Sequence, residues 1–582
     1  MTRRNFIKLS GLTAFALSPV ARIGAALGTT GVVSTQLNAS ATFSDYKALV
    51  VIFLDGGNDA MNMVVPTEKG VSGAYDTTAF DDYKTIRYDS TSPLFGSLDI
   101  ANADLYSTNF NVDANDHYTN TNSAAHPYVD PIKDDAVDGK SDSAIRSYRV
   151  GSYHTTDTTK DITDPLNPVY SPTSTKTGLG INSMMPEVAA MYKSGKVSIV
   201  SNVGTLAEPI TKTQIDAFDA GTSTSPKPPV FLFAHNHQKR AVYTAQAEQL
   251  GNTGWAGRLA DVWRVNDPIG LNLTYGDVNR LGIGISTSPL KMPTDVPVSF
   301  ETPFDTTGET TGGTAFESIL NRFNTITKTN AFSDYYSNKI KKAGDLSSSL
   351  IEGMKSKPIF SSTNTYGNPL FDFDGPSDDA EHYTEFTVGL AMHDNIREDI
   401  FKQLKAAAEM IKVGKDQLNN TRQVIYIRMP GYDTHSGQAT NQLNNLRSLS
   451  MAMGDFQKSL EEMGMDKEVL SVTMSDFGRT LKNNSNGTDH GWGGHSFVMT
   501  GDPKFNGGKV YGTVMTDLTL TGDNCYTEKG RIIPTTSIEQ MVSPCLKWFG
   551  VDNTLMPTLL PNLANFSANA NTANLESMFT TN

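Results

Sequence analysis

The sequence predicts an α/β protein whose central sheet is mostly parallel and is flanked by helices. Three apolar runs of strand length, residues 47–54, 423–429 and 469–474, end abruptly in polar, glycine-rich sequence. Between the second and third runs, apolar residues recur at three- and four-residue steps over residues 438–464, the period of an amphipathic helix. A strand, a helix and a strand of these lengths predict a right-handed crossover between parallel strands. The polar loops after the strands are therefore expected at one edge, where open α/β sheets bind their ligands.

Regular structure is also expected on either side of these runs. Residues 184–203 predict a short helix followed by a strand, and residues 537–548 predict a helix near the C-terminus. Residues 67–177 are rich in Asp, Ser, Thr, Asn and Tyr with few apolar runs, which is typical of surface loops. We expect one large domain over residues 45–565, with insertions near 67–177 and 289–385.

The N-terminal residues predict an export signal. They carry a twin arginine, Arg3 and Arg4, then Phe-Ile-Lys and a short apolar region that ends in small residues near Ala25. This order is typical of the twin-arginine pathway, and the apolar region is too short to span a membrane as a helix. The alternative for the same residues is an amphipathic starting helix. We expect residues 1–26 to be a cleaved signal that engages the twin-arginine translocon, which makes the mature protein periplasmic or secreted.

Composition and charge disfavour a disordered chain, a membrane anchor and nucleic-acid binding. The chain has 582 residues, and its apolar content of 38% is that of a globular protein with a large core. No other run of about 18 apolar residues occurs, so we expect a soluble mature protein with no stable membrane anchor. The formal charge is −14 and no Lys/Arg run is present, which disfavours nucleic acid as a partner.

Carboxylates and imidazoles are concentrated in the loops that follow the three strands. These groups bind divalent metals, and the mixture favours zinc or manganese, with calcium or magnesium possible if carboxylates dominate. Asp55 and Asp59 are alternatives for one ligand after the first strand, or parts of a tight turn with the nearby glycines. The candidate ligands are Asp55, Asp59, Asp433, His435, Asp476, Asp489, His490 and His495.

Further candidates lie near the same edge. Arg479 is placed to stabilise charge on a transferring oxyanion, because a guanidinium binds such oxygens bidentately; the alternative is an ion pair with one of the aspartates. Thr205 follows the strand that ends at residue 203 and is the nearest hydroxyl at that edge. His235 and His237 alternate, so on an extended segment they share one face, where they would ligate a metal or lie at the surface.

Five motifs carry a resemblance to a known family: FLDGGNDAMNMVVP (53–66), GWAGRLAD (254–261), GYDTH (431–435), SDFGRT (475–480) and GTDHGWGGH (487–495). Together they resemble the bacterial domain-of-unknown-function family 1501, which is usually placed with the alkaline phosphatase and sulfatase superfamily. The resemblance implies an alkaline-phosphatase-like fold, a metal ligand at Asp55 and a nucleophile near Thr205. The family's own pattern puts weight on Asp59 and Asn62 in place of Asp55.

The sequence departs from the superfamily pattern at three places. Ala234 stands where many relatives have a serine, and Phe477 stands where a Ser-Asp-His-Gly motif has a metal-binding histidine. Neither Cys525 nor Cys545 lies in the C-x-P-x-R context of formylglycine sulfatases. The centre is therefore expected to hold one or two metals, and the two cysteines form either a disulfide or two buried thiols.

Two functions follow from these features. The first is an exported, metal-dependent hydrolase of phosphate or sulfate esters, with a small anionic ester or glycan as substrate. The second is a non-catalytic exported binding or structural protein that retains the fold, since fold alone does not establish function.

Overall fold

The computed structural model describes residues 42–66, 79–87, 147–151, 176–182, 185–263, 270–294, 350–364, 368–372, 396–484 and 487–580. The predicted signal of residues 1–26 and most of the two predicted insertions lie outside these ranges. Within them, no helix is both long and apolar enough to cross a membrane.

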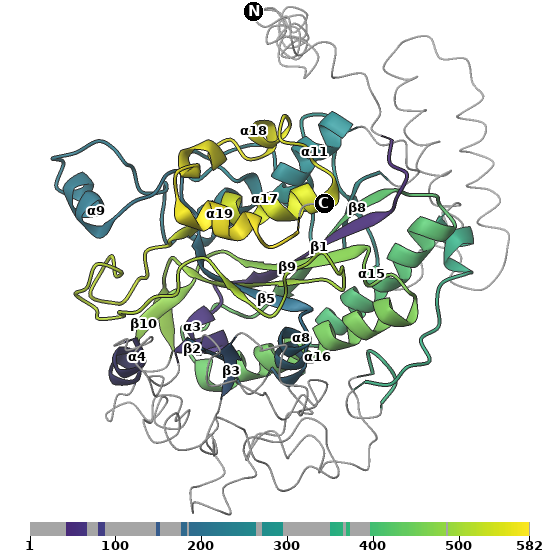
Figure 1. Cartoon of the computed structure of the whole chain (residues 1–582), viewed down its shortest axis with the longest axis horizontal. Helices are drawn as coiled ribbons and strands as arrows, with labels where there is room; N and C mark the ends of the chain where they lie inside the picture. Colours follow the sequence, from purple (N-terminus) through teal and green to yellow (C-terminus); the bar gives the residue numbers. More distant parts are fainter. Residues whose placement is uncertain are drawn as a thin grey trace, which may run out of the picture.

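A nine-stranded sheet forms the centre of the molecule (Figure 1). Its strands are β1 (Lys47–Asp55), β5 (Val197–Gly204), β6 (Asn272–Thr274), β7 (Leu290–Lys291), β8 (Arg422–Pro430), β9 (Val469–Ser475), β12 (Gly494–Met499), β13 (Val510–Tyr511) and β14 (Thr536–Ser537). They are ordered β13-β5-β12-β9-β1-β8-β6-β7, and β14 pairs with β5 off this path. Only β12 runs antiparallel to its neighbours β5 and β9. The predicted α/β class with a mostly parallel sheet is confirmed.

Strand β1 lies at the middle of the sheet, between β8 and β9. Its end is in register with theirs: Asp55 pairs with Pro430, and Leu54 pairs with Ser475. Helix α16 (Gln438–Glu462) connects β8 to β9, as predicted, but the two strands are not neighbours because β1 separates them. The loops that follow these three parallel strands therefore leave the same edge of the sheet.

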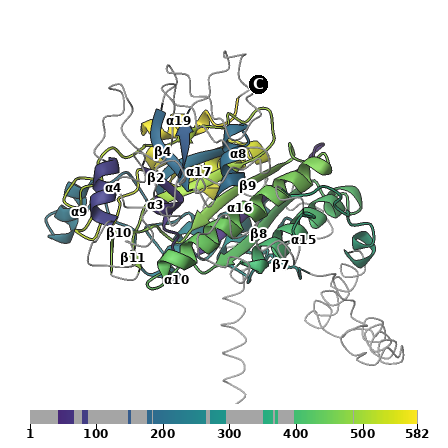
Figure 2. The same ribbon diagram turned by 90° about the horizontal axis from the view of Figure 1, so that it is seen from below.

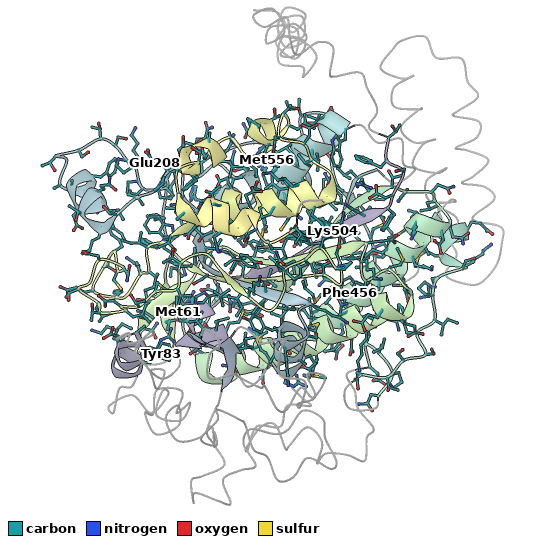
Figure 3. All side chains as sticks on the ribbon, viewed as in Figure 1. Met61, Tyr83, Glu208, Phe456, Lys504 and Met556 are labelled. Carbon is teal, nitrogen blue, oxygen red and sulfur yellow. The ribbon has the colours of Figure 1, made fainter. Side chains whose placement is uncertain are left out.

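Helices cover both faces of the sheet (Figure 1). Side chains of β1 alternate between two cores: Ile52 belongs to the cluster that includes Phe456 of α16, and Phe53 belongs to the cluster that includes Met556. Figure 3 shows Phe456 and Met556 on opposite sides of the sheet. One face carries α8 (Pro186–Lys193), α15 (Glu398–Asp416) and α16, and the other carries α11 (Trp255–Trp263), α17 (Ile538–Phe549), α18 (Met556–Leu559) and α19 (Ala570–Glu576).

Shorter elements surround the C-terminal edge of the sheet. Hairpin β10 (Arg479–Asn483) and β11 (Thr488–His490) follows β9, and α10 (His235–Thr244) lies beside it in Figure 2. The remaining elements are α3 (Ala60–Met63), β2 (Val64–Pro66), α4 (Ala79–Arg87), β3 (Ser147–Gly151), β4 (Lys176–Asn182), α9 (Lys212–Asp219) and the short 3-10 helices Arg280–Gly282 and Leu563–Phe566.

Two local expectations change with the structure. His235 and His237 do not lie on an extended segment, because His235 begins helix α10; residues two apart on a helix do not share a face. In the predicted loop insertion, β3 and β4 form a small sheet with β2, so part of that segment has regular structure.

Cys525 and Cys545 are both free and buried, in different core clusters.

Candidate metal centre

Three imidazole rings converge at the C-terminal edge of the sheet. The Nε2 atom of His490, at the end of β11, lies 3.0 Å from Nε2 of His235 and 2.8 Å from Nε2 of His435. Asp433, in the loop after β8, completes the group: Oδ1 lies 3.3 Å from Nε2 of His490, and Oδ2 lies 3.4 Å from Nε2 of His235. One ligating atom from each of His235, Asp433 and His490 falls within 4.8 Å of the others.

The outer nitrogen of each ring faces a hydrogen-bond acceptor. Nδ1 of His490 lies 2.7 Å from the carbonyl oxygen of Phe233, and Nδ1 of His235 lies 2.8 Å from Oδ2 of Asp476. Nδ1 of His435 faces Oδ1 of Asp489 at 3.4 Å. Since these oxygens only accept, Nδ1 carries a proton at His235 and His490, where the contacts are hydrogen bonds. In the neutral form of either ring, Nε2 is then left with a lone pair. Nitrogen lone pairs about 3 Å apart repel one another unless a cation or a proton lies between them.

This arrangement fits the donor set of a divalent metal. Histidines that bind metals generally donate their second N–H to a carboxylate or a backbone carbonyl, which fixes the tautomer and aims the other nitrogen. Here that pattern occurs at His235 and His490 with short contacts, and at His435 with a longer one. Imidazole nitrogens with one carboxylate suit zinc and manganese among the common divalent ions.

The electrostatics of the group keep Asp433 charged. Burial acts to raise the pKa of Asp433, but the hydrogen bond and charge of Arg479, with two of the histidines, hold that pKa below its ordinary value. The hydrogen bond to Asp476 raises the pKa of His235, whereas burial lowers the pKa of His490. The centre thus contains an ionised carboxylate beside imidazoles of unequal basicity.

Asp476 positions a histidine and does not join the converging ligand atoms. Its side chain is fully buried; Oδ2 accepts from His235, and Oδ1 accepts from the backbone N–H of Gly56 at 3.1 Å. Gly56 has φ of +121°, and a Cβ there would stand 2.4 Å from the backbone nitrogen of Asp433. Only glycine fits this junction, where the loop after β1 packs directly against the loop after β8.

Phe233 supports the centre through its backbone. It has a left-handed φ of +68°, which is rare for an aromatic residue, and this conformation directs its carbonyl to His490. Its ring lies under the guanidinium of Arg531 at 3.9 Å, and Arg531 also donates to the carbonyl of His490. Left-handed non-glycine residues cost about 1–3 kcal/mol and cluster at functional sites.

The two aspartates after β1 are engaged in ion pairs. Asp55 is paired with Lys239 at 2.6 Å through Oδ1 and with Arg428 at 2.6 Å through Oδ2. Asp59 is fully buried and forms a bidentate pair with Arg87, at 2.7 and 2.8 Å. The structure does not bring either carboxylate to the three converging Nε2 atoms.

Two further candidate ligands also lie apart from the convergence point. Asp489 faces His435 and is paired with Lys529 at 2.7 Å, a contact that lowers the pKa of Asp489 to about 2. His495 is buried, its Nδ1 accepts from the backbone of Asn202 at 3.4 Å, and burial lowers its pKa to about 4. Together with Asp476, His495 lines a cavity of about 20 Å³ behind the centre.

The two predicted catalytic side chains are both buried. Arg479 is entirely inaccessible and donates to Asp433 at 2.9 Å and to Thr488 at 3.2 Å, which is the ion-pair alternative raised from the sequence. Thr205 donates its hydroxyl to Gln238 at 2.5 Å and its carbonyl accepts from Trp492. In the described ranges, no hydrogen bond joins Thr205 to the converging histidines or to Asp433.

Two groups beside the histidines, the Phe233 carbonyl and the Lys239 ammonium, were not predicted from the sequence. The Phe233 carbonyl carries no sequence signal, because a backbone acceptor can belong to any residue. Lys239 lies four residues after His235, a spacing that places both on one face once α10 is known to be a helix. The sequence does not reveal that helix, because the alternation His-Asn-His in its first turn is equally compatible with an extended strand.

Comparison with known proteins gives a family match over the segment that contains the motifs at 431–435, 475–480 and 487–495. No curated protein matches the chain. Residues 407–525 match a family model described as "Protein of unknown function (DUF1501)", and this stretch contains β8, α16, β9 and the hairpin that carries His490. Over these residues the chain is similar to the DUF1501 family, whose description records no function.

Proposed function

We propose that His235, His490, Asp433 and His435 hold one divalent metal ion, with zinc or manganese preferred. The observation that carries this proposal is the convergence of three Nε2 atoms whose rings are anchored through Nδ1. Hydrogen bonding to protein accounts for it only if a ring is protonated at both nitrogens, because neutral rings present acceptors to one another and Nε2 of His490 also faces Oδ1 of Asp433. Asp476 and the Phe233 carbonyl orient the rings from outside.

The proposed centre is open to solvent on one side, which favours a catalytic over a structural role. The side chains of Asp433 and His435 are 47% and 45% exposed, whereas the supporting carboxylate of Asp476 is 0% exposed. Structural metal sites are closed by protein ligands, and catalytic ones keep a position for water or substrate. The site also lies at the carboxyl edge of parallel strands, the usual place for ligand binding in open α/β sheets.

Hydrolysis of phosphate or sulfate esters is the activity we propose, in an exported protein of alkaline-phosphatase-like fold. A bound metal would supply Lewis acidity and lower the pKa of water. The chain's own residues would bind that ion and fix the imidazole tautomers, while Lys239 pairs with Asp55 and Lys529 pairs with Asp489. We propose direct attack by water, because the hydroxyl of Thr205, the nucleophile expected from the sequence, is buried and donates to Gln238.

A second candidate is a non-catalytic exported protein that keeps the fold and the metal. The observation that favours it is the burial of Arg479, which turns the guanidinium nearest the centre away from any substrate. Lys239 and Lys529 are likewise engaged by Asp55 and Asp489, so none of these three cations faces the centre without a carboxylate partner. A binding role would therefore rest on the metal and not on a dedicated anion pocket.

Turnover of the metal-loaded protein distinguishes the two candidates. Purified protein loaded with zinc or manganese is assayed on aryl phosphate monoesters, diesters and aryl sulfates, beside His490→Ala and the matched control His237→Ala. His237 lies in the same turn of α10 as His235 but stacks on Phe231 outside the centre. We expect one ester class to be hydrolysed by the wild type and by His237→Ala, and not by His490→Ala. Binding of one metal with no turnover on any ester would support the second candidate.

A further inference from the structure

A lysine ammonium lies between two carboxylates next to the proposed metal centre. Nζ of Lys239 is 2.6 Å from Oδ1 of Asp55 and 3.9 Å from Oδ2 of Asp476. Both carboxylates are sequestered, with side-chain exposures of 7% and 0%, and they stand at the ends of neighbouring parallel strands β1 and β9. A positive charge between them offsets the repulsion of two buried carboxylates.

Helix α10 delivers this ammonium to the same side as a metal ligand. His235 and Lys239 are four residues apart, so they share one face of the helix. The same oxygen of Asp476 accepts from Nδ1 of His235 at 2.8 Å and faces Nζ of Lys239. Asp476 is therefore the bridge between the proposed metal ligands and the lysine.

The pair of carboxylates has the chemistry of a divalent cation site. Oxygen ligands from two aspartates at adjacent strand ends suit Mg²⁺, Mn²⁺ or Ca²⁺. A lysine ammonium is a compact point charge with three donors, and it neutralises such a pair without demanding a full coordination shell. Arg428 holds the remaining oxygen of Asp55 at 2.6 Å, which leaves Asp55 with no free oxygen.

We infer that Lys239 takes the place of a second divalent ion, so that the centre holds a single metal beside a resident ammonium. This inference rests on the proposed function, because it assigns the number of ions in that same centre. A pair of metals about 4 Å apart would clamp both the attacking and the leaving oxygens of an ester. Here Lys239, whose side chain is 26% exposed, supplies the second positive charge.

Counting bound metal in lysine variants tests the inference without any assay of activity. Protein stripped with chelator is dialysed to equilibrium against Mn²⁺, and bound manganese per chain is measured for wild type, Lys239→Met, Lys239→Arg and the double variant Lys239→Met/Asp55→Asn. Lys529→Met is the matched control, because Lys529 also pairs with an aspartate at this edge but lies outside the pair of carboxylates. Circular dichroism reports whether each variant is folded.

We expect one equivalent in the wild type, in Lys239→Arg and in Lys529→Met. Lys239→Met should gain a second, weaker equivalent, and the double variant should lose it again because one carboxylate of the pair is gone. A second equivalent in the wild type would overturn the inference while leaving the metal centre intact. A folded Lys239→Met protein that still binds one ion would overturn it as well. No bound metal in the wild type would overturn the proposed centre itself.

Discussion

Nε2 of His235 lies 3.0 Å from Nε2 of His490, although Nδ1 of each ring already faces an oxygen acceptor. In their neutral forms the two rings direct lone pairs at one another, from residues that are 255 positions apart in the sequence and lie on α10 and β11. Such a contact is unfavourable by itself and favourable around a cation. It is the geometric reason for treating this edge of the sheet as a metal centre.

Replacing Asp476 with asparagine should weaken metal binding while the protein stays folded. Asparagine keeps the size of the side chain but loses the charge that holds Nδ1–H of His235. Loss of such an outer carboxylate generally costs about 10–100-fold in metal affinity. Competition with a chromophoric chelator measures the change. Asp489→Asn should cost less affinity, because the contact between Asp489 and His435 is longer, at 3.4 Å. An equal loss of affinity in both variants would show that Asp476 supports the centre no more than Asp489 does.

Replacing Arg479 with methionine should destabilise the fold. The guanidinium is wholly buried and donates to Asp433 and Thr488, so its removal leaves the buried Thr488 hydroxyl without that donor and Asp433 without its ion pair. We expect a loss of about 3 kcal/mol, near the lower end for a broken buried pair because Asp433 is half-exposed. Urea unfolding measures it, with Arg479→Lys as a variant that keeps the charge. Unchanged stability combined with lost turnover would restore the oxyanion role predicted from the sequence.

Replacing Asp59 with asparagine should reduce stability without removing metal. Asp59 and Arg87 are almost fully buried and paired bidentately, and breaking such a pair from one side costs about 3–5 kcal/mol. The double variant Asp59→Asn/Arg87→Gln should recover part of that loss, because it leaves no buried charge behind. Denaturant unfolding and metal analysis are run on the same samples. Loss of bound metal from folded Asp59→Asn protein would instead make Asp59 a ligand.

Acid should destabilise the metal-free protein partly through His495. Burial lowers the pKa of His495 to about 4 from an ordinary value of 6.5. Between these pH values His495 binds a proton in the unfolded chain but not in the folded chain. The free energy of unfolding therefore falls as pH falls from 6.5 to 4. The loss attributable to this residue is at most about 3 kcal/mol.

The variant His495→Gln isolates that contribution, because every other titrating group is common to both proteins. Its free energy of unfolding, measured in urea at intervals from pH 7 to 4, should decline less steeply than that of the wild type. Parallel curves would show that His495 is protonated as easily in the folded protein as in the unfolded one.

The sequence was sufficient for the core of the fold. Runs of β-branched and apolar residues located β1, β8 and β9, and their order around a helix implied one common edge for the loops that follow. The position of β1 between β8 and β9 could not be predicted from the sequence. Sheet order depends on long-range strand pairing, which hydrophobic periodicity does not encode. The antiparallel strand β12 was hidden for the same reason.

For the site, sequence reasoning located the right loops but not the division of roles within them. Asp55, Asp59 and Asp476 belong to the residue types that bind metals, yet each is turned toward a cationic or histidine partner from another part of the chain. Lys239 and Arg87 decide those roles, and neither lies in the loops that concentrate the candidate ligands. The direction of a carboxylate is a tertiary property, so residue type alone proposes more ligands than the structure brings together.

Metal content tests the proposed centre most directly. Plasma mass spectrometry on the purified, folded protein, after exposure to zinc and to manganese, is compared with Asp433→Asn, His490→Ala and the control His237→Ala. We expect about one tightly bound ion in the wild type and in His237→Ala, and loss of that ion in the other two variants without unfolding. A wild-type protein that retains no metal after reconstitution, or an ion that survives in His490→Ala, would contradict the proposed centre.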